Sequence, residues 1–403
     1  MFAKINFFYN SNLKKSKNFN KNLIKTKNIF KNLSYEIKNH EIPLLESYEK
    51  DYNFDFTPSV IKKFSKYKNI IVFGMGGSIL GIKTIFSFLN KKIKKKAFFF
   101  DNLDTSLLAE FKKIKNLNNS CFILVSKSGN TLETITNISA IFSETLLKNK
   151  LIIITEIMDN ALMSIAIKYN AEIIQHKEFI SGRYSVFSES GMFPAALMDL
   201  KLKNFKNLKV LVKNKNFVDS LTQNVASIYT LIRQGKNNSV ILNYDSSLND
   251  LGYWYQQLVA ESLGKKGKGI NPIIAFGPKD HHSLLQLYLD GPKDKFFTFF
   301  ASSNKNNKHR ISNKIIPDKL KFLKNKNLES IIKAQSQATK NIFELKKIPF
   351  RQITFNKKNE KELGEIFTFF VLETLLLSRL IKVNPFDQPA VEQIKIETKK
   401  ILN

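Results

Sequence analysis

Short runs of consecutive hydrophobic residues alternate along the chain with longer segments in which hydrophobic positions recur at helical spacing. The runs lie at 69–74, 96–102, 121–126, 151–157 and 171–176, and again at 239–244, 272–277, 295–302 and 349–355. A continuous hydrophobic run is typical of a strand buried on both faces, and helices between such runs join the strands in parallel. We therefore predict an α/β protein with two parallel sheets, each flanked by helices.

The longer segments between these runs predict helices. We expect them from Ser78 onward and over 131–148, 248–265, 327–346 and 359–382. The most apolar stretch, 366–381, contains Glu373 and Arg379. Because a bilayer disfavours charged side chains, we interpret this stretch as a buried core helix and not as a membrane span.

The hydrophobic pattern also divides the chain into parts. It is weak over the first fifty residues, which we expect to be helical or loose, and near 200–215, which is typical of a linker. We predict an N-terminal helical segment, two α/β domains and a C-terminal helix, at 1–50, 51–200, 201–383 and 384–403. Ligands of such sheets bind beyond the carboxyl ends of the strands, so we expect the functional residues in the loops there.

Composition narrows the possible partners. The 403 residues, 43% of them hydrophobic, are enough for two packed domains. A net charge of +30 would normally indicate a nucleic acid or an anionic membrane, but only five of the 64 basic residues are arginine, which base recognition favours. The lysines are spread along the whole chain. We expect a solvated lysine surface, with neither nucleic acid nor a membrane as partner.

The single cysteine and the N-terminus favour a cytoplasmic location. Cys121 lies inside a hydrophobic run and is predicted to be buried. One cysteine forms no internal disulfide, which fits a reducing compartment. Lysines interrupt every short hydrophobic run among the first thirty residues, so we expect no secretory signal there, and a plastid-type transit segment stays open as an alternative.

A glycine-rich turn, GMGGSILG at 74–81, follows the first strand and opens a helix. Free backbone N–H groups at such a turn hold phosphate. Position 79 is isoleucine, so the dinucleotide pattern G-x-G-x-x-G is incomplete, and the lysine-serine pair of a nucleotide P-loop is missing. We therefore expect a simpler anion than a dinucleotide or a nucleoside triphosphate.

A second loop of this kind, SKSGNTLET at 126–134, follows the third strand. Its hydroxyl and N–H groups suit a small phosphate monoester. The alternative is helix capping, with Ser128 or Asn130 as the cap and Glu133 completing the capping box. Two such loops on neighbouring strands favour phosphate binding.

The second half of the chain supplies candidate proton-transfer groups. Glu261 follows Gln257 by four residues, so both lie on one face of the helix over 248–265. His281 and His282 lie where a strand gives way to a helix. A carboxylate and an imidazole in one cleft would carry out proton transfer at neutral pH. The alternative for the histidines is a helix start capped by Asp280, and their spacing does not fit a metal site.

Six motifs in order along residues 74–395 resemble the glucose-6-phosphate isomerase family. They are GMGGSILG, SKSGNTLET, GRYSVFSESG, QQLVAESLGK, PKDHHSLLQLYLDG and NPFDQPAVEQIK. The resemblance implies two sugar isomerase (SIS) type domains with helical terminal segments, working as a homodimer without cofactor or metal. It implies reversible isomerisation of glucose 6-phosphate and fructose 6-phosphate through ring opening and a cis-enediol intermediate.

The resemblance also implies residue roles. Glu261 takes the place of the base that moves a proton between the first two sugar carbons, and Arg183 that of the arginine facing the enediolate. His282 and Lys395 match the ring-opening pair; position 281 is usually glutamine in the family. The substrate-binding matches are Gly77, Ser78, Ser126, Lys127, Ser128, Gly129, Asn130, Thr131 and Gln257. Two alternatives stay open: an isomerase that also accepts mannose 6-phosphate, and a non-catalytic sugar phosphate sensor.

Overall fold

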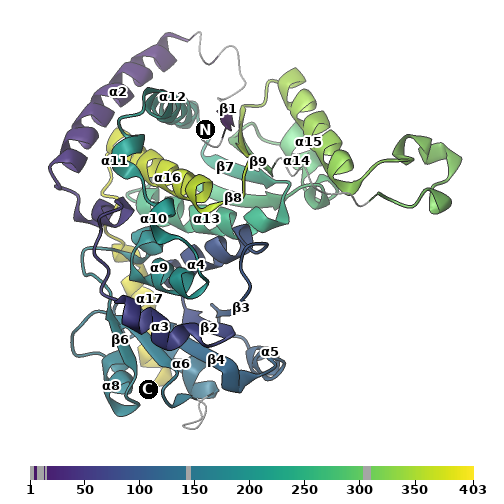
Figure 1. Ribbon diagram of the computed structural model, residues 1–403. Helices are drawn as coiled ribbons and strands as arrows, with labels where there is room; N and C mark the ends of the chain where they lie inside the picture. The colour runs from purple at the N-terminus through teal and green to yellow at the C-terminus, as the bar shows by residue number, and fades with distance from the viewer. Residues whose placement is uncertain (1–3, 7–12, 14–15, 142–146, 303–309) are drawn as a thin grey trace.

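Two lobes, each built around one five-stranded sheet, lie one above the other in the computed structural model (Figure 1). The structure describes residues 4–6, 13, 16–141, 147–302 and 310–403. The lower lobe in Figure 1 holds the strands of residues 69–175, and the upper lobe holds those of residues 238–355 together with a short strand at residues 4–6. The predicted α/β architecture with two sheets flanked by helices is confirmed.

The first sheet is fully parallel, with the order β3-β2-β4-β5-β6. Its strands are β2 (Asn69–Gly74), β3 (Lys96–Phe100), β4 (Ser120–Val125), β5 (Leu151–Thr155) and β6 (Glu172–Gln175). Successive residues of a strand point to opposite faces. Ile70 and Val72 therefore enter the core shared with the upper lobe, whereas Ile71 and Phe73 enter a separate core on the outer face.

The strand order of this sheet reverses between β2 and β4. Crossovers leave these two neighbouring strands toward opposite sides, which opens a crevice at their carboxyl ends. The glycine turn after β2 and the hydroxyl-rich loop after β4 therefore lie side by side. The helices of this lobe are α3 (Pro58–Ser65), α4 (Gly77–Phe88), α5 (Leu107–Lys112), α6 (Leu132–Ala140), α8 (Ala161–Lys168) and α9 (Glu189–Leu197). Of the helix predicted over 131–148, residues 142–146 lie outside the described part.

The second sheet repeats this topology with the order β10-β9-β7-β8. Its parallel strands are β7 (Asn238–Asn243), β8 (Asn271–Phe276), β9 (Lys295–Ser302) and β10 (Phe350–Phe355). A short strand that we did not predict, β1 (Lys4–Asn6), pairs antiparallel with β10 at the edge. Three residues are too few to produce a periodic signal.

Helices α12 (Lys215–Arg233), α13 (Asn249–Leu263), α14 (Leu285–Asp290), α15 (Leu328–Leu345) and α16 (Glu360–Ile381) surround this sheet. The apolar stretch predicted as a core helix is α16, and it is buried along most of its length. Its Glu373 pairs with Arg351 of β10, so the charge inside the helix is compensated. Helices α4 and α13 pack against each other, and one core continues through both lobes.

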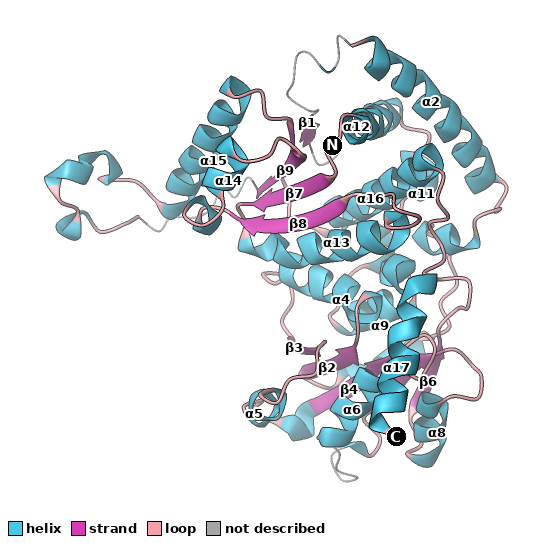
Figure 2. Ribbon diagram, turned by 180° about the vertical axis from the view of Figure 1, so that it is seen from behind, coloured by secondary structure: helices cyan, strands magenta, loops and turns pink. Residues whose placement is uncertain are grey.

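The remaining segments are residues 200–215, which pack into the core, and helices near the two ends of the chain. The stretch 200–215 is not a linker: it folds into α10 (Leu202–Phe205) and α11 (Leu208–Leu211), which bury Phe205 and Leu211. Helix α2 (Lys17–Lys38) packs against α12. Helix α17 (Glu392–Leu402) is exposed along nearly its whole length and runs beside the lower lobe (Figure 2). The predicted domain boundaries remain predictions.

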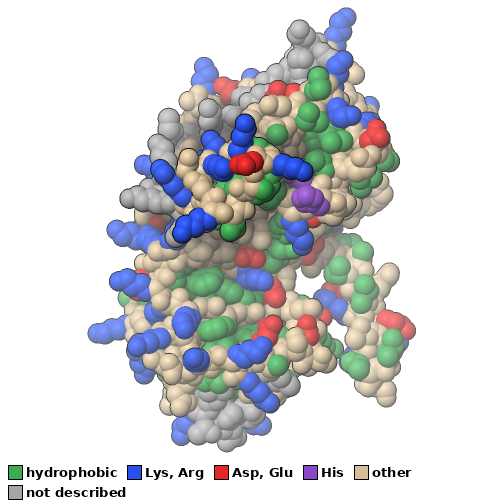
Figure 3. Space-filling view, turned by 90° about the vertical axis from the view of Figure 1, so that its right-hand side faces the viewer, with side chains coloured by type: hydrophobic (Ala, Val, Ile, Leu, Met, Phe, Trp, Pro, Cys, Tyr) green, Lys and Arg blue, Asp and Glu red, His purple; other side chains and the backbone are tan. Residues whose placement is uncertain are grey.

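The surface and the interior agree with two expectations drawn from composition. Lysine and arginine side chains are spread over both lobes of the face in Figure 3 and do not gather in one patch. Cys121 is fully buried in β4. Within the described ranges, no helix combines the length and hydrophobicity that crossing a membrane requires.

Candidate active site between the two lobes

The glycine turn after β2 touches both lobes through bare backbone. A β-carbon on Gly77 would lie 2.1 Å from the carbonyl carbon of Gly182, and one on Gly76 would lie 2.7 Å from Nε2 of Gln257. Gly76 also has a φ of 51°, which favours glycine. The turn therefore holds Gly77 and Ser78 at the start of α4 in direct contact with the segment that carries Arg183 and the helix that carries Glu261.

The hydroxyl-rich loop after β4 does not serve as a helix cap. Thr131 is the N-cap residue of α6, and its side chain makes no capping hydrogen bond. Ser126 Oγ and Thr131 Oγ1 are instead 2.7 Å apart, while Asn130 Oδ1 accepts a hydrogen bond from the backbone of Ala161. The capping alternative is therefore wrong for Ser128 and Asn130.

Lys127 and Gly129 complete this loop. Lys127 donates to the backbone oxygen of Glu178 at 2.6 Å and lies 3.6 Å from the carboxylate of Glu156. Gly129 has a φ of 66°, and a β-carbon there would lie 2.0 Å from the side-chain oxygen of Asn160. The loop is thus a tight turn that presents backbone N–H groups and hydroxyls at the crevice beside the glycine turn.

Gln257 and Glu261 lie one turn apart on α13, as their spacing predicts. Gln257 Nε2 donates to Glu261 Oε1 at 2.7 Å. Gln257 Oε1 is buried without a hydrogen-bond partner among the described residues. An acceptor of this kind is left for a donor from outside the chain, such as a sugar hydroxyl.

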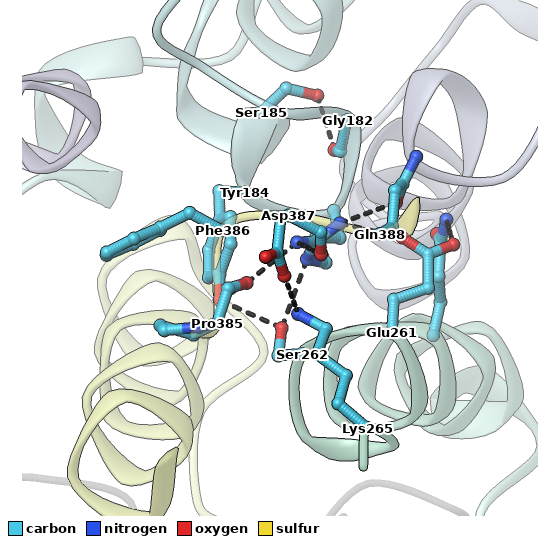
Figure 4. Close-up of polar contacts among 12 residues, drawn as sticks. Gly182, Tyr184, Ser185, Glu261, Ser262, Lys265, Pro385, Phe386, Asp387 and Gln388 are labelled. Carbon is cyan, nitrogen blue, oxygen red and sulfur yellow. Dashed lines mark hydrogen bonds and ion pairs between the residues drawn. The ribbon is translucent and has the colours of Figure 1, made fainter. Parts of the chain in front are cut away.

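The side chain of Arg183 is 1% exposed, and Figure 4 shows Glu261, Ser262 and Gln388, which accept hydrogen bonds from it. Its guanidinium carries five N–H donors, and each has an acceptor. The acceptors are Ser262 Oγ at 3.1 Å from Nε, Glu261 Oε2 at 3.1 Å and Gln388 Oε1 at 2.6 Å from Nη1, and the carbonyls of Pro385 at 2.7 Å and Asp387 at 3.1 Å from Nη2. The predicted base and the predicted cation are therefore in direct contact.

Four of these five acceptors come from residues that sequence reasoning missed: Ser262, which follows Glu261 on α13, and three residues near the C-terminus. Pro385, Asp387 and Gln388 lie in the segment between α16 and α17, about two hundred positions after Arg183. Lys265 ties the same segment to the end of α13, with Nζ 2.8 Å from the carboxylate of Asp387. The available signal was that Gln388 lies inside the motif NPFDQPAVEQIK, of which we singled out Lys395 alone.

The two histidines lie away from this cluster. Strands β7 and β8 are parallel, so α13 runs back from the carboxyl edge of the sheet to its amino edge, where Glu261 lies. His281 and His282 follow β8 and lie at the carboxyl edge, where His281 Nε2 is 2.6 Å from Tyr244 Oη. A six-residue strand is about 20 Å long. Within one chain, Glu261 and His282 therefore lie at opposite edges of the second sheet, and the expectation that they share one cleft stays a prediction.

Lys395 is also remote from Arg183 in its contacts. It lies on the exposed helix α17, is 66% exposed, and pairs with Glu392 of the same helix at 2.6 Å. His282 is exposed as well. Among the described residues, no hydrogen bond or ion pair joins His282 or Lys395 to Glu261 or Arg183.

One cavity borders the site, and a larger one lies apart from it. One of about 420 Å³ borders the loop after β4, with Lys127, Ser181 and Phe386 in its wall. A larger one of about 580 Å³ lies under α15 at the carboxyl edge of the second sheet, with Tyr244, Lys333 and Lys340 in its wall, and contains none of the predicted site residues. In the ranges that the structure covers, no three His, Cys, Asp or Glu residues are grouped to hold a metal ion.

Comparison with known proteins finds a family model and relatives that all carry the name of one isomerase. Residues 59–403 match the family model of phosphoglucose isomerase. The chain is 33% identical to a glucose-6-phosphate isomerase of Methanocaldococcus jannaschii over 86% of this chain and 87% of that protein. It is 29% identical to the enzyme of the same name from Campylobacter jejuni, over 91% of this chain and 94% of that one.

Solved structures share the fold. A hypothetical protein from Thermus thermophilus superposes with a TM-score of 0.80 at 20% identity, over 99% of both chains. A glucose-6-phosphate isomerase from Chlamydia trachomatis superposes with a TM-score of 0.71 at 17% identity, over 85% of this chain and 71% of that chain.

Proposed function

The chain belongs to the phosphoglucose isomerase family, and from this premise we propose how it interconverts glucose 6-phosphate and fructose 6-phosphate. Glu261 takes the proton from C2 of the open-chain aldose, and the electron pair left on C2 forms the C1–C2 double bond of an enediolate as the carbonyl electrons move onto O1. O1 then gains a proton and the hydroxyl on C2 loses one, and Glu261 returns its proton to C1, which leaves the ketone at C2. Arg183 stabilises the negative charge that develops on the enediolate oxygen. The observation that carries this proposal is the 3.1 Å contact between Glu261 Oε2 and Arg183 Nη1.

Substrate must displace a partner of Arg183, because all five of its donors are occupied. Gln388 is the replaceable one: its neutral amide oxygen approaches Nη1 at 2.6 Å and lies in the exposed segment before α17. An enediolate oxygen carries more negative charge than an amide oxygen and forms the stronger hydrogen bond with a guanidinium. Gln388 thus holds the place of the reacting oxygen in the free enzyme.

The phosphate of the sugar binds at the two loops of the lower lobe. Gly77 and Ser78 contribute from the turn after β2, and the loop Ser126–Thr131 contributes from the carboxyl end of β4. Their position at the point where the strand order reverses supports this assignment. Gln257 contacts the sugar between them, and the phosphate supplies binding energy that orients the reacting carbons.

We assign ring opening to His282 and Lys395, with His282 acting in the site of a second copy. His282 and Glu261 lie at opposite edges of the second sheet, so one chain does not present both to one sugar. A second copy can supply the missing imidazole. Lys395 contributes a proton or a positive charge from α17.

A homodimer follows from this assignment, and two exposed apolar regions support it. Residues 310–327 project from the upper lobe (Figure 1) and carry Ile315 at 84% and Phe322 at 66% exposure. Helix α17 carries Ile394 and Ile401 at 71% and 78% exposure. Apolar side chains at such positions are typical of surfaces covered by another protein chain. We further propose a cytoplasmic location, which the free buried thiol of Cys121 supports.

A coupled assay tests the proposed function. Purified protein is supplied with fructose 6-phosphate, and glucose 6-phosphate is detected through a dehydrogenase that reduces NADP. We expect rapid turnover that is lost in Glu261→Gln. Absence of turnover in the unmodified protein would overturn the proposal, since a sugar phosphate sensor would bind without converting. Mannose 6-phosphate in the same assay decides the breadth of substrate.

A further inference from the structure

We propose that Ser262 and Tyr184 are positioning residues that fix the Arg183 guanidinium so that its Nη1 donors face the substrate. The inference rests on the role proposed above for Arg183. Both side chains are fully buried, and Ser262 accepts a hydrogen bond from Arg183 Nε. Figure 4 shows Ser262 and Tyr184 on one side, next to Pro385, and Glu261 and Gln388 on the other.

The hydrogen bonds around Arg183 close into a ring. Arg183 Nε donates to Ser262 Oγ at 3.1 Å, and Ser262 Oγ lies 2.8 Å from Tyr184 Oη. Tyr184 Oη donates to the carbonyl of Pro385 at 3.2 Å, and the same carbonyl accepts from Arg183 Nη2 at 2.7 Å. The ring therefore joins α13, the 3₁₀ helix Gly182–Phe187 and the segment after α16.

Only one arrangement of protons satisfies this ring. A carbonyl accepts and does not donate, so the Tyr184 hydroxyl hydrogen points to Pro385. Because the Tyr184 hydrogen is used in that bond, the hydrogen between the two hydroxyls comes from Ser262, which donates to Tyr184 Oη and accepts from Arg183 Nε. Burial raises the pKa of Tyr184 above its usual value, so its hydroxyl remains a donor at neutral pH. The Tyr184 ring also lies 5.3 Å from the guanidinium carbon.

The ring divides the guanidinium into an anchored half and a working half. In the anchored half, Nε donates to Ser262 Oγ, and Nη2 donates to the carbonyls of Pro385 and Asp387. Because the guanidinium is planar, fixing two of its nitrogens also fixes the third. Nη1 is then aimed at Glu261 and at the place that Gln388 occupies. Ser262 follows Glu261 directly on α13, so one helix turn sets both the base and the cation.

The contact itself can be tested without reference to activity. The chain has five arginines, so a ¹⁵N spectrum of the arginine Nε–H groups is simple, and Arg183→Gln identifies the signal of Arg183. In Ser262→Ala we expect that signal to shift and its hydrogen to exchange faster with water, because a buried donor has lost its acceptor. An unchanged signal would overturn the inference.

Kinetics test whether the contact serves the reaction. We expect Ser262→Ala to lower kcat by about 10- to 100-fold through misplacement of Nη1, with KM close to the unmodified value. We expect a smaller loss in Tyr184→Phe, since Ser262 still accepts from Arg183. The control is Ser227→Ala, which removes another buried serine hydroxyl, one that bonds to its own helix, and should leave kcat unchanged.

A double-mutant cycle separates positioning from a general structural effect. If Ser262 acts through Arg183, then Ser262→Ala lowers kcat in the unmodified protein and has no further effect in an Arg183→Gln background. Equal losses in both backgrounds, or no loss in the first, would overturn the inference. Failure of the proposed function gives a different result. In that case the unmodified protein shows no isomerase activity, or Arg183→Gln leaves the activity unchanged, and neither result depends on the Nε signal.

Discussion

Gly76 of the lower lobe and Gln257 of the upper lobe approach so closely that a β-carbon on the glycine would lie 2.7 Å from the amide nitrogen. Gln257 in turn donates to Glu261 at 2.7 Å. A continuous line of contacts therefore runs from the glycine turn, through Gln257, to the proposed base Glu261 and to Arg183. Small displacements of the turn should be felt at the reacting carbons.

The neighbouring position, Gly77, offers a test of this coupling. In Gly77→Ala the new methyl group would clash with the backbone of Gly182. Relieving the clash requires a backbone segment to move, which costs more than a side-chain rotation. We expect the free energy of unfolding to fall by about 1–3 kcal/mol and kcat/KM to fall with it. Urea unfolding and the coupled assay measure the two effects.

Gly252→Ala provides the matched control. Gly252 lies inside α13, and the three atoms nearest to an added β-carbon all belong to the side chain of Ile274, at 3.3–3.6 Å. Stability and kcat/KM should change little there. If Gly77→Ala behaves like Gly252→Ala, the close contact between the two glycine segments has no functional weight.

Replacing the proposed base separates binding from chemistry. Glu261→Gln keeps the size of the side chain and removes its ability to accept the carbon-bound proton. We expect kcat to fall by about 10² to 10⁴ with KM little changed, as is typical of an acid–base group. Steady-state kinetics and the loss of tritium from C2-labelled glucose 6-phosphate measure this. Turnover within a few-fold of normal would exclude Glu261 as the base.

A mixed dimer tests whether two copies share one site. Glu261→Gln and His282→Ala chains with different tags are co-expressed, and the heterodimer is isolated. If His282 serves the partner's Glu261, one of the two sites is intact, and we expect about half the activity of the unmodified dimer on the ring form of the substrate. Activity no higher than the mean of the two homodimers would rule out a shared site.

The burial of Lys206 should make the protein more stable as the pH rises above neutral. Its side chain is 1% exposed, with Nζ 3.9 Å from the Phe54 ring centroid, and has no hydrogen-bond acceptor among the described residues. Burial lowers the pKa of Lys206 to about 7. Between that value and its ordinary pKa near 10.5, the unfolded chain holds a proton that the folded chain lacks, so stability rises with pH across this window.

The Lys206→Met variant should remove this rise. We expect it to be more stable than the unmodified protein at pH 7, by an amount on the order of a few kcal/mol, and the difference to shrink toward pH 10. Lys203→Met, at an exposed position, is the control. Parallel pH profiles for the unmodified protein and Lys206→Met, measured by urea unfolding, would contradict the account.

Much of the fold was predictable from the sequence because each buried parallel strand appears as a continuous run of hydrophobic residues. The run at 69–74 became β2 with the same bounds, and the apolar stretch 366–381 became the core of α16. Strand β1 left no such signal. The prediction of a linker at 200–215 was wrong because its apolar residues, such as Phe205, are interspersed with lysines and form only short helices.

The site was only partly predictable, because some of its contacts are local and others are not. The spacing of Gln257 and Glu261 fixes their contact on one helix. The bond from Arg183 to Gln388 joins residues 205 positions apart and depends on how the lobes pack. The separation of Glu261 from His282 follows from topology: a crossover helix ends at the opposite edge of the sheet from the loop after the next strand.

The most direct test of the central claim is a crystal structure with fructose 6-phosphate bound to Glu261→Gln. The account predicts the phosphate in hydrogen-bonding contact with Ser126 and Thr131, and C1 and C2 of the sugar within about 3.5 Å of the side chain at position 261. A sugar bound elsewhere, such as in the cavity under α15, with the crevice between the lobes empty, would contradict it.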